Sequence, residues 1–171
     1  LPLGRKTTIR CGGRDLGLAV EAFAVQGKTA LYLEDPSAKE FGTQDGDTIG
    51  LKITQTATGR HFFYVPGCAG VDAALARRLR GADLVFFDGT LWSEREMLDQ
   101  GLMAKTGSRM GHLNISGPDG SIAALAPLGV KRKVFIHINN SNPILDPASP
   151  ERAQALAAGW TIAEDGMRFS L

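Results

Sequence analysis

The sequence has little of what marks secreted, membrane-bound or nucleic-acid-binding proteins. Only two cysteines, Cys11 and Cys68, occur in 171 residues, and no C-x-x-C pair indicates a zinc ribbon or a redox site. The net charge of +1 gives no electrostatic footprint for nucleic acid or an anionic membrane. No apolar run approaches the roughly 18 residues of a membrane span. We therefore expect a soluble, cytoplasmic chain with two buried reduced thiols, a disulfide between them being the alternative.

The composition is that of a folded globular protein. Hydrophobic residues make up 43% and charged residues 22% of the chain, which excludes disorder as the default state. Neither repeats nor a linker-like stretch divide the sequence, so residues 1–171 are predicted to form a single domain. The chain opens on Leu1 rather than Met, which indicates that preceding residues are missing.

The order of the predicted elements indicates a mixed α/β fold. The first part of the sequence predicts strands, and strands then alternate with helices. Ser93 and Ser149 are N-cap residues for two of the helices, and Glu96 stands at the capping-box position of the first. The predicted strands are 18–25, 29–33, 48–54, 60–65, 82–87, 133–138, 161–163 and 167–171, and the predicted helices are 71–79, 94–100, 121–125 and 150–158.

Two predicted buried strands end in residues that bind metals. Asp88 directly follows the apolar run 82–87, and His137 lies near the end of 133–138. In α/β sheets ligands are held at the carboxyl ends of strands, and a buried carboxylate is costly unless it is bonded or coordinated. The simpler alternatives are that Asp88 caps the next turn, with Gly89 at positive φ, and that His137 is a core histidine. The occurrence of both residues at equivalent strand ends favours a metal site.

A glycine-rich basic segment, 105–112, carries a third group of candidates. It lacks the spacing of a phosphate-binding loop, so we interpret it as a loop that brings Lys105, Arg109 and His112 to an anionic substrate. A solvated loop with an incidental histidine is the alternative. His61 is predicted to lie on the surface.

Several short motifs in series closely resemble the PqqB-like family of pyrroloquinoline quinone (PQQ) biosynthesis proteins, which belongs to the metallo-β-lactamase superfamily. The resemblance runs from about Leu16 to the C-terminus. The motifs are Val65-Pro66-Gly67-Cys68-Ala69, Phe87-Asp88-Gly89-Thr90, Lys105-Thr106-Gly107, Arg109-Met110-Gly111-His112, Gly120-Ser121-Ile122-Ala123, His137-Ile138-Asn139-Asn140, Asn142-Pro143 and Ala158-Gly159-Trp160.

The resemblance implies a four-layer αββα sandwich with a metal site between two sheets, of which this chain is similar to the C-terminal half. It implies that Asp88 and His137 bind the metal, and that His112 lies close to it with a catalytic role as acid or base. We assign Lys105 and Arg109 to substrate carboxylates from their charge, and Asn140 to substrate binding.

The sequence also departs from the family pattern. The histidine that most superfamily members carry after a turn would fall near Lys28, and the family's C-x-C-x-x-C cluster and H-x-H-x-D-H motif are absent from these residues. Asp88 and His137 alone make an incomplete site, since mononuclear iron commonly takes two histidines and one carboxylate. We therefore expect little activity from this chain alone, and either a homodimer or completion of the site by an N-terminal segment.

The function implied by the resemblance is PQQ biosynthesis. The complete protein would oxygenate the tyrosine ring of the crosslinked Glu–Tyr precursor with non-haem iron, zinc being the alternative metal. One alternative function is a soluble carrier that transports PQQ or its precursor to the periplasm, and another is a zinc-dependent hydrolase. The expected partners are the peptide-derived precursor and other PQQ biosynthesis proteins, with no nucleic acid and no membrane insertion.

Overall fold

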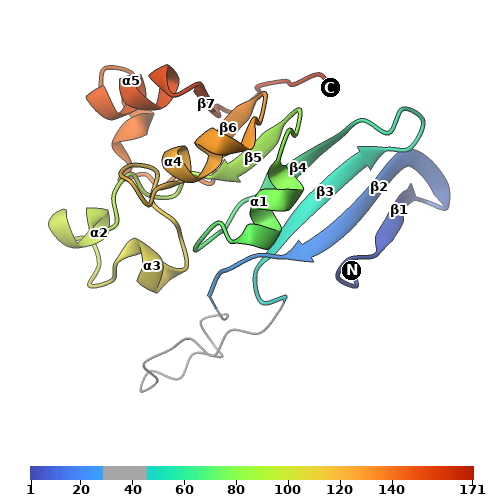
Figure 1. The fold of residues 1–171 in the computed structure, drawn as a ribbon, viewed down its shortest axis with the longest axis horizontal. Coiled ribbons are helices and arrows are strands. Elements are labelled where there is room, and N and C mark those ends of the chain that lie inside the picture. The colour runs from blue at the N-terminus through green and yellow to red at the C-terminus, as the bar shows by residue number, and fades with distance from the viewer. Residues whose placement is uncertain (29–45) are drawn as a thin grey trace.

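Seven strands form one mixed sheet in the computed structural model, which describes residues 1–28 and 46–171 (Figure 1). The strands lie side by side in their sequence order. Pairs from β1 to β4 are antiparallel, and pairs from β4 to β7 are parallel. The strands are β1 (Lys6–Cys11), β2 (Arg14–Ala24), β3 (Ile49–Gln55), β4 (His61–Val65), β5 (Val85–Asp88), β6 (Lys133–Ile136) and β7 (Trp160–Ile162).

The antiparallel half contains one strand that the sequence pattern missed. β1 and β2 are joined by Gly12 and Gly13, both at positive φ (54° and 81°), as a tight two-residue hairpin loop requires. The Gly-Gly pair was a sequence signal for this hairpin. The strand was missed because residues 6–11 are largely exposed and lack the apolar face that predicts a strand. The strands predicted at 18–25, 48–54 and 60–65 are confirmed, and the one predicted at 29–33 lies outside the described residues.

Helices and the central strands share one hydrophobic core. α1 (Ala73–Leu79), α4 (Ser121–Leu125) and α5 (Pro150–Ala157) form at the three predicted positions (Figure 1). Asp72 and Ser149 accept the capping hydrogen bonds of α1 and α5 from backbone N–H groups, which satisfies donors that the first turn leaves unpaired. The principal core residues are Phe23, Phe63, Val65, Leu75, Leu79, Val85, Phe87, Leu125, Phe135, Ala155, Trp160 and Ile162.

Alternate side chains of the central strands form a second apolar face of the sheet. Phe86 lies at its centre, with edge-on contacts to Phe62 and Phe169 at ring-centroid distances of 5.6 and 5.1 Å. Tyr64, 38% exposed, flanks Phe86. The strand predicted at 167–171 is wrong. Phe169 instead packs its ring on this face, and the Ser170 carbonyl accepts a hydrogen bond from the Arg132 guanidinium rather than from a neighbouring strand.

The helix predicted at 94–100 is shorter than expected. α2 covers only Glu96–Asp99, and Ser93 does not cap it. The Glu94 carboxylate accepts instead from the Ser108 N–H in α3 (Gly107–Met110), which draws the chain away from a helical path. The Glu96 carboxylate reaches back to the Trp92 N–H at 2.6 Å, not to Ser93. Tertiary hydrogen bonds have therefore overridden the local capping pattern.

The cysteine prediction is half right. Both cysteines are free thiols, but Cys11 is exposed at the end of β1 and only Cys68 is buried. Cys11 lies on the edge strand, where none of the described elements packs over its side chain. The apolar thiol therefore stays exposed. The disulfide alternative is excluded in this structure.

Candidate metal centre

Asp88 lies fully buried at the carboxyl end of β5, paired with Ile136 of β6. Its Oδ2 accepts a hydrogen bond from the Cys68 N–H at 2.9 Å and lies 2.7 Å from His112 Nδ1. Its Oδ1 accepts from the Thr90 N–H at 3.0 Å and the Thr90 hydroxyl at 2.6 Å. An ionised carboxylate has about four lone-pair sites, so these contacts satisfy it without a counter-ion from lysine or arginine.

Gly89 permits the close packing of the two parallel strands at this end. A Cβ on Gly89 would lie 2.9 Å from the Phe135 Cβ and 3.1 Å from the Ile136 carbonyl oxygen. Gly89 does not have the positive φ that the turn interpretation assigned to it. The glycine is needed for contact with β6, and Asp88 does cap the following turn through Thr90.

His137 terminates β6 two residues before the predicted end of the strand. It has φ 54°, a left-handed conformation that few non-glycine residues adopt, and this breaks the strand after Ile136. The turn places His137 Nδ1 2.8 Å from Thr90 Oγ1, and the His137 carbonyl 3.0 Å from the same hydroxyl. The imidazole is 54% exposed, so His137 is not a core histidine.

The loop after β6 is tied to the loop after β5. The Asn139 N–H donates to the Thr90 carbonyl at 3.1 Å, and the buried Asn142 side chain donates to the Gly89 carbonyl at 2.9 Å. Ser141 donates its hydroxyl to Glu96, a carboxylate that is only 4% exposed. These bonds fix the position of His137 relative to Asp88.

His112 reaches the site from the end of α3. Gly111 ends that helix in the left-handed conformation (φ 84°), and a Cβ there would lie 2.6 Å from the Lys28 Cβ. Lys28, at the position expected for a family histidine, therefore packs against the backbone beside His112. The next residue, Leu113, donates its N–H to the Cys68 carbonyl, which joins this loop to the β4–α1 connection.

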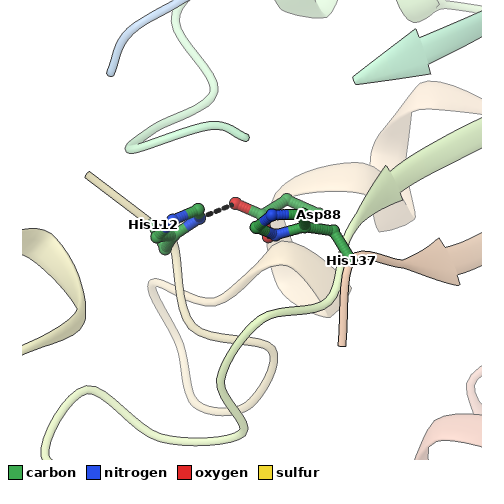
Figure 2. Close-up of side chains that lie close together, drawn as sticks. All are labelled: Asp88, His112 and His137. Carbon is green, nitrogen blue, oxygen red and sulfur yellow. Dashed lines mark hydrogen bonds and ion pairs between the residues drawn. The ribbon is translucent and has the colours of Figure 1, made fainter. Parts of the chain in front are cut away.

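Asp88, His112 and His137 form a cluster whose candidate ligand atoms all lie within 4.8 Å of one another (Figure 2). The two imidazole rings stack at 5.3 Å between centroids with an interplanar angle of 23°. Ligands 2.0–2.1 Å from a tetrahedral zinc lie about 3.3 Å apart, so the most distant of these atoms would move together by up to about 1.5 Å to bind one ion. One carboxylate and two imidazoles thus fit a zinc or a non-haem iron ion.

Cys68 contributes to the cluster through its backbone and not its sulfur. Burial raises the pKa of the Cys68 thiol to about 12, and the thiol donates to the Gly70 carbonyl at 3.1 Å. The Cys68 sulfur therefore faces Gly70 and is not among the candidate ligand atoms of the cluster.

The other predicted site residues lie around the cluster rather than in it. Lys105 precedes α3 and Arg109 lies on it, in the segment that leads to His112. Asn140 and His137 line the same open pocket of about 570 Å³, together with Ile136, Leu145 and Glu164. His61 begins β4, at the opposite end of the parallel strands from the cluster, with its ring against Phe63.

Thr90 is the site residue that the sequence reasoning missed. Its hydroxyl lies within 3.1 Å of Asp88, His112 and His137. The Asp-x-Thr spacing was a signal, because aspartate commonly accepts from the backbone N–H two residues on. Nothing in the sequence indicated that the threonine hydroxyl would meet histidines 22 and 47 residues away.

Within residues 1–28 and 46–171, no helix combines the length and apolar character needed to cross a membrane.

Comparison with known proteins identifies strong likenesses. Residues 1–138 match the family model of the β-lactamase superfamily domain. The chain is 53% identical over 159 residues to coenzyme PQQ synthesis protein B of Bradyrhizobium diazoefficiens, covering 93% of this chain and 52% of that protein. It is 50% identical over 155 residues to the Xanthomonas euvesicatoria protein of the same name, covering 91% and 51%. The chain spans about half the length of these curated relatives.

A solved structure shows the same fold. The crystal structure of Zn(2+)-bound PqqB from Methylobacterium extorquens superposes with a TM-score of 0.89 at 42% identity, covering all of this chain and 55% of that one. The predicted mixed α/β fold, its metallo-β-lactamase character and the PqqB-like resemblance are confirmed.

Proposed function

The chain belongs to the β-lactamase superfamily, and from that premise we propose that it acts in PQQ biosynthesis by supplying the Asp88–His112–His137 face of a metal centre. One observation carries the proposal: two imidazoles and a buried carboxylate converge at the carboxyl ends of two parallel strands. The identity of about 50% to coenzyme PQQ synthesis proteins B supports the biosynthetic role.

The proposed reaction is oxygenation of the tyrosine ring in the crosslinked Glu–Tyr precursor. Asp88 and His137 hold the ion, with His112 as the third donor. A bound iron ion supplies redox chemistry with O2, whereas zinc supplies Lewis-acid activation of water. Asp88 would bring the negative charge that offsets the cation. The contacts from Cys68 and Thr90 would keep its carboxylate oriented, and the ion would take the place of His112 at Oδ2.

The surrounding residues bind and orient the substrate. His112 is only 19% exposed and its Nδ1 faces Asp88, so Nε2 is the ring nitrogen that would serve as the third donor to the ion. If His112 instead acts as the acid or base, the same Nε2 would exchange a proton with the substrate phenol without binding the ion. Lys105 and Arg109 bind substrate carboxylates: the Arg109 guanidinium can do so with two parallel hydrogen bonds, and the Lys105 ammonium with its positive charge. Asn140 contacts the substrate from the pocket beside His137.

We propose that residues 1–171 are one domain of an αββα sandwich that a further segment or a second copy completes. The apolar sheet face around Phe86 and the half-exposed Tyr64 fits packing against a second sheet. The partners would be the precursor and the other PQQ biosynthesis proteins that supply or consume it, in the cytoplasm.

The pocket beside His137 favours a second candidate, a carrier that transports PQQ or its precursor. A volume of about 570 Å³ is in the range of small-molecule sites, and Ile136 and Leu145 give it apolar walls. A carrier would bind the quinone without turnover. Zinc-dependent hydrolysis at the same centre is the third candidate, and the Lys28 position does not supply the extra histidine it would use.

Metal analysis and an oxygen-consumption assay on the same preparation test the proposal. The expected result is stoichiometric iron and O2 uptake that depends on the crosslinked precursor, both lost in His137→Ala and retained in the matched surface control His61→Ala. Tight quinone binding without O2 uptake would establish the carrier instead. Zinc with cleavage of an ester substrate would establish the hydrolase.

A further inference from the structure

Thr90 occupies the centre of the cluster, although no reaction step has been assigned to it. Its side chain is on the turn after β5, and the residue is 8% exposed. The hydroxyl oxygen has four polar neighbours: Asp88 Oδ1 at 2.6 Å, His137 Nδ1 at 2.8 Å, the His137 carbonyl at 3.0 Å and His112 Nδ1 at 3.1 Å. A hydroxyl has one hydrogen to donate and two lone pairs, so the four contacts cannot be equivalent.

The distances determine where the hydroxyl hydrogen lies. The Asp88 carboxylate can only accept, and the 2.6 Å contact is the length of a hydroxyl donating to an ionised oxygen. The two other possible acceptors, His137 Nδ1 at 2.8 Å and the His137 carbonyl at 3.0 Å, are farther away and uncharged. A hydrogen directed at either of them would leave two acceptor oxygens facing each other at 2.6 Å. The Thr90 hydroxyl therefore donates to Asp88, and its lone pairs face the imidazoles.

His137 must then donate to Thr90. Its Nδ1 lies 3.9 Å from Asp88 Oδ1, too far for a direct hydrogen bond, and Thr90 fills that gap. With Nδ1 protonated, the neutral ring carries its lone pair on Nε2. The same hydroxyl lies 3.0 Å from the His137 carbonyl, at the residue whose φ is 54°, so Thr90 contacts both the ring and the backbone of His137.

We propose that Thr90 is a positioning residue: it links the exposed His137 to the buried Asp88 and holds the imidazole in the Nδ1–H tautomer, with Nε2 available to a divalent cation. His112 differs, since its Nδ1 contacts Asp88 directly at 2.7 Å and meets Thr90 only at 3.1 Å. Loss of the Thr90 hydroxyl should therefore affect His137 far more than His112. The predicted loss of metal affinity rests on the proposed metal centre. The predicted tautomer of His137 does not depend on it.

The first measurement is the ring ¹⁵N spectrum of the unaltered metal-free protein at a pH where imidazoles are neutral. Within residues 1–171 only three histidines occur, and His61→Gln and His112→Gln variants assign them. The proposal predicts a protonated Nδ1 and a lone-pair Nε2 for His137. A dominant Nε2–H form, or tautomers averaged as in a free imidazole, would overturn it. This result stands even if the protein binds no metal.

The second measurement is the Zn²⁺ dissociation constant of Thr90→Val and Thr90→Ser by competition with a chromophoric chelator. Valine keeps the shape without the hydroxyl, and serine keeps the hydroxyl. We expect a loss of about 10–100-fold for valine, the usual effect of removing a partner of a ligating histidine, and a change of less than about threefold for serine. Equal affinities for the two variants, with Zn²⁺ bound, would overturn the proposal. Absence of Zn²⁺ binding in the unaltered protein would refute the metal centre, and the ¹⁵N spectrum would still decide the role of Thr90.

Discussion

The two ends of the parallel strands β5 and β6 both carry charged residues, but their environments are opposite. At the amino end, Asp83 pairs with Lys131 at 2.6 Å, with side chains 48% and 69% exposed. At the carboxyl end, Asp88 is fully buried and is satisfied by two backbone N–H groups and by the side chains of Thr90 and His112. Exposed pairs are screened by water, whereas a buried carboxylate depends on each of its partners.

This difference shows where the strands can support chemistry. The amino end is a solvated ion pair, and the described residues place no histidine cluster there. The carboxyl end combines a fully buried, fixed carboxylate with two imidazoles, a set of donors that binds divalent cations. Substitutions at matched positions of the two ends test this difference through their effects on stability, metal affinity and reactivity.

The largest effect is expected for Asp88→Ala against Asp83→Ala. Removing the Asp88 carboxylate leaves the Cys68 and Thr90 N–H groups buried without acceptors, which should lower the free energy of unfolding by roughly 3–5 kcal/mol. Asp83→Ala should lower the urea midpoint only slightly, because the exposed pair is screened by water. Equal losses of stability in the two variants would remove the distinction between the two ends.

The next effect concerns metal affinity rather than stability. His112→Ala and His137→Ala should each weaken Zn²⁺ binding by more than about 100-fold, since removing a ligand exceeds the effect of an outer partner. His61→Ala, at the opposite end of the strands, should bind Zn²⁺ as the unaltered protein does. Isothermal titration of the three variants provides the comparison, and unchanged affinity in His137→Ala would refute the assignment.

A smaller, chemical effect distinguishes the two cysteines. Because burial raises the pKa of Cys68 to about 12, its thiol should not react with a thiol-exchange reagent in the folded protein at mildly alkaline pH. Cys11 is exposed and should react. Counted by the absorbance of the released reagent, residues 1–171 should show one reactive thiol in the folded protein and two after denaturation. Rapid reaction of Cys68 in the native state would show that the Asp88 pocket is open to solvent.

The smallest effect is expected at the Asp83–Lys131 pair. The hydrogen bond and charge of Lys131 lower the pKa of Asp83, so the pair stabilises the fold above the ordinary aspartate pKa. That stabilisation is lost as the pH falls through the lowered pKa, below about 4. Lys131→Met should therefore show a slightly lower melting temperature than the parent at neutral pH and low salt, with the difference vanishing in acid. A difference that grows in acid would contradict the assigned sign.

The carboxyl-end site was partly predictable from sequence. Asp88 and His137 follow apolar strands, and parallel strands bring their carboxyl ends to one edge, so their proximity follows from the pattern. The positions of His112 and Thr90 depend on a loop closed by Gly111 against Lys28 and on a turn shaped by Gly89. Such contacts depend on packing between distant segments, which periodicity does not encode.

The fold shows the same division between local and tertiary signals. Helix α5 was predictable because Ser149 caps it locally. Helix α1 was predicted to begin at residue 71, whereas Asp72 is its N-cap and the helix begins at Ala73. Helix α2 was predicted too long because Glu94 hydrogen-bonds to Ser108 instead of joining the helix. The segment 167–171 has strand-forming residues, but Phe169 packs onto the sheet face beside Phe86 and pairs with no strand.

The most direct test of the metal centre is anomalous X-ray diffraction from crystals of the protein, recorded at the iron and zinc absorption edges. The account predicts a peak about 2.0–2.3 Å from a ring nitrogen of His137, with His112 and Asp88 around it, and the edge identifies the metal. A fully occupied metal elsewhere in the protein, with Asp88, His112 and His137 bonded only to one another, would contradict it.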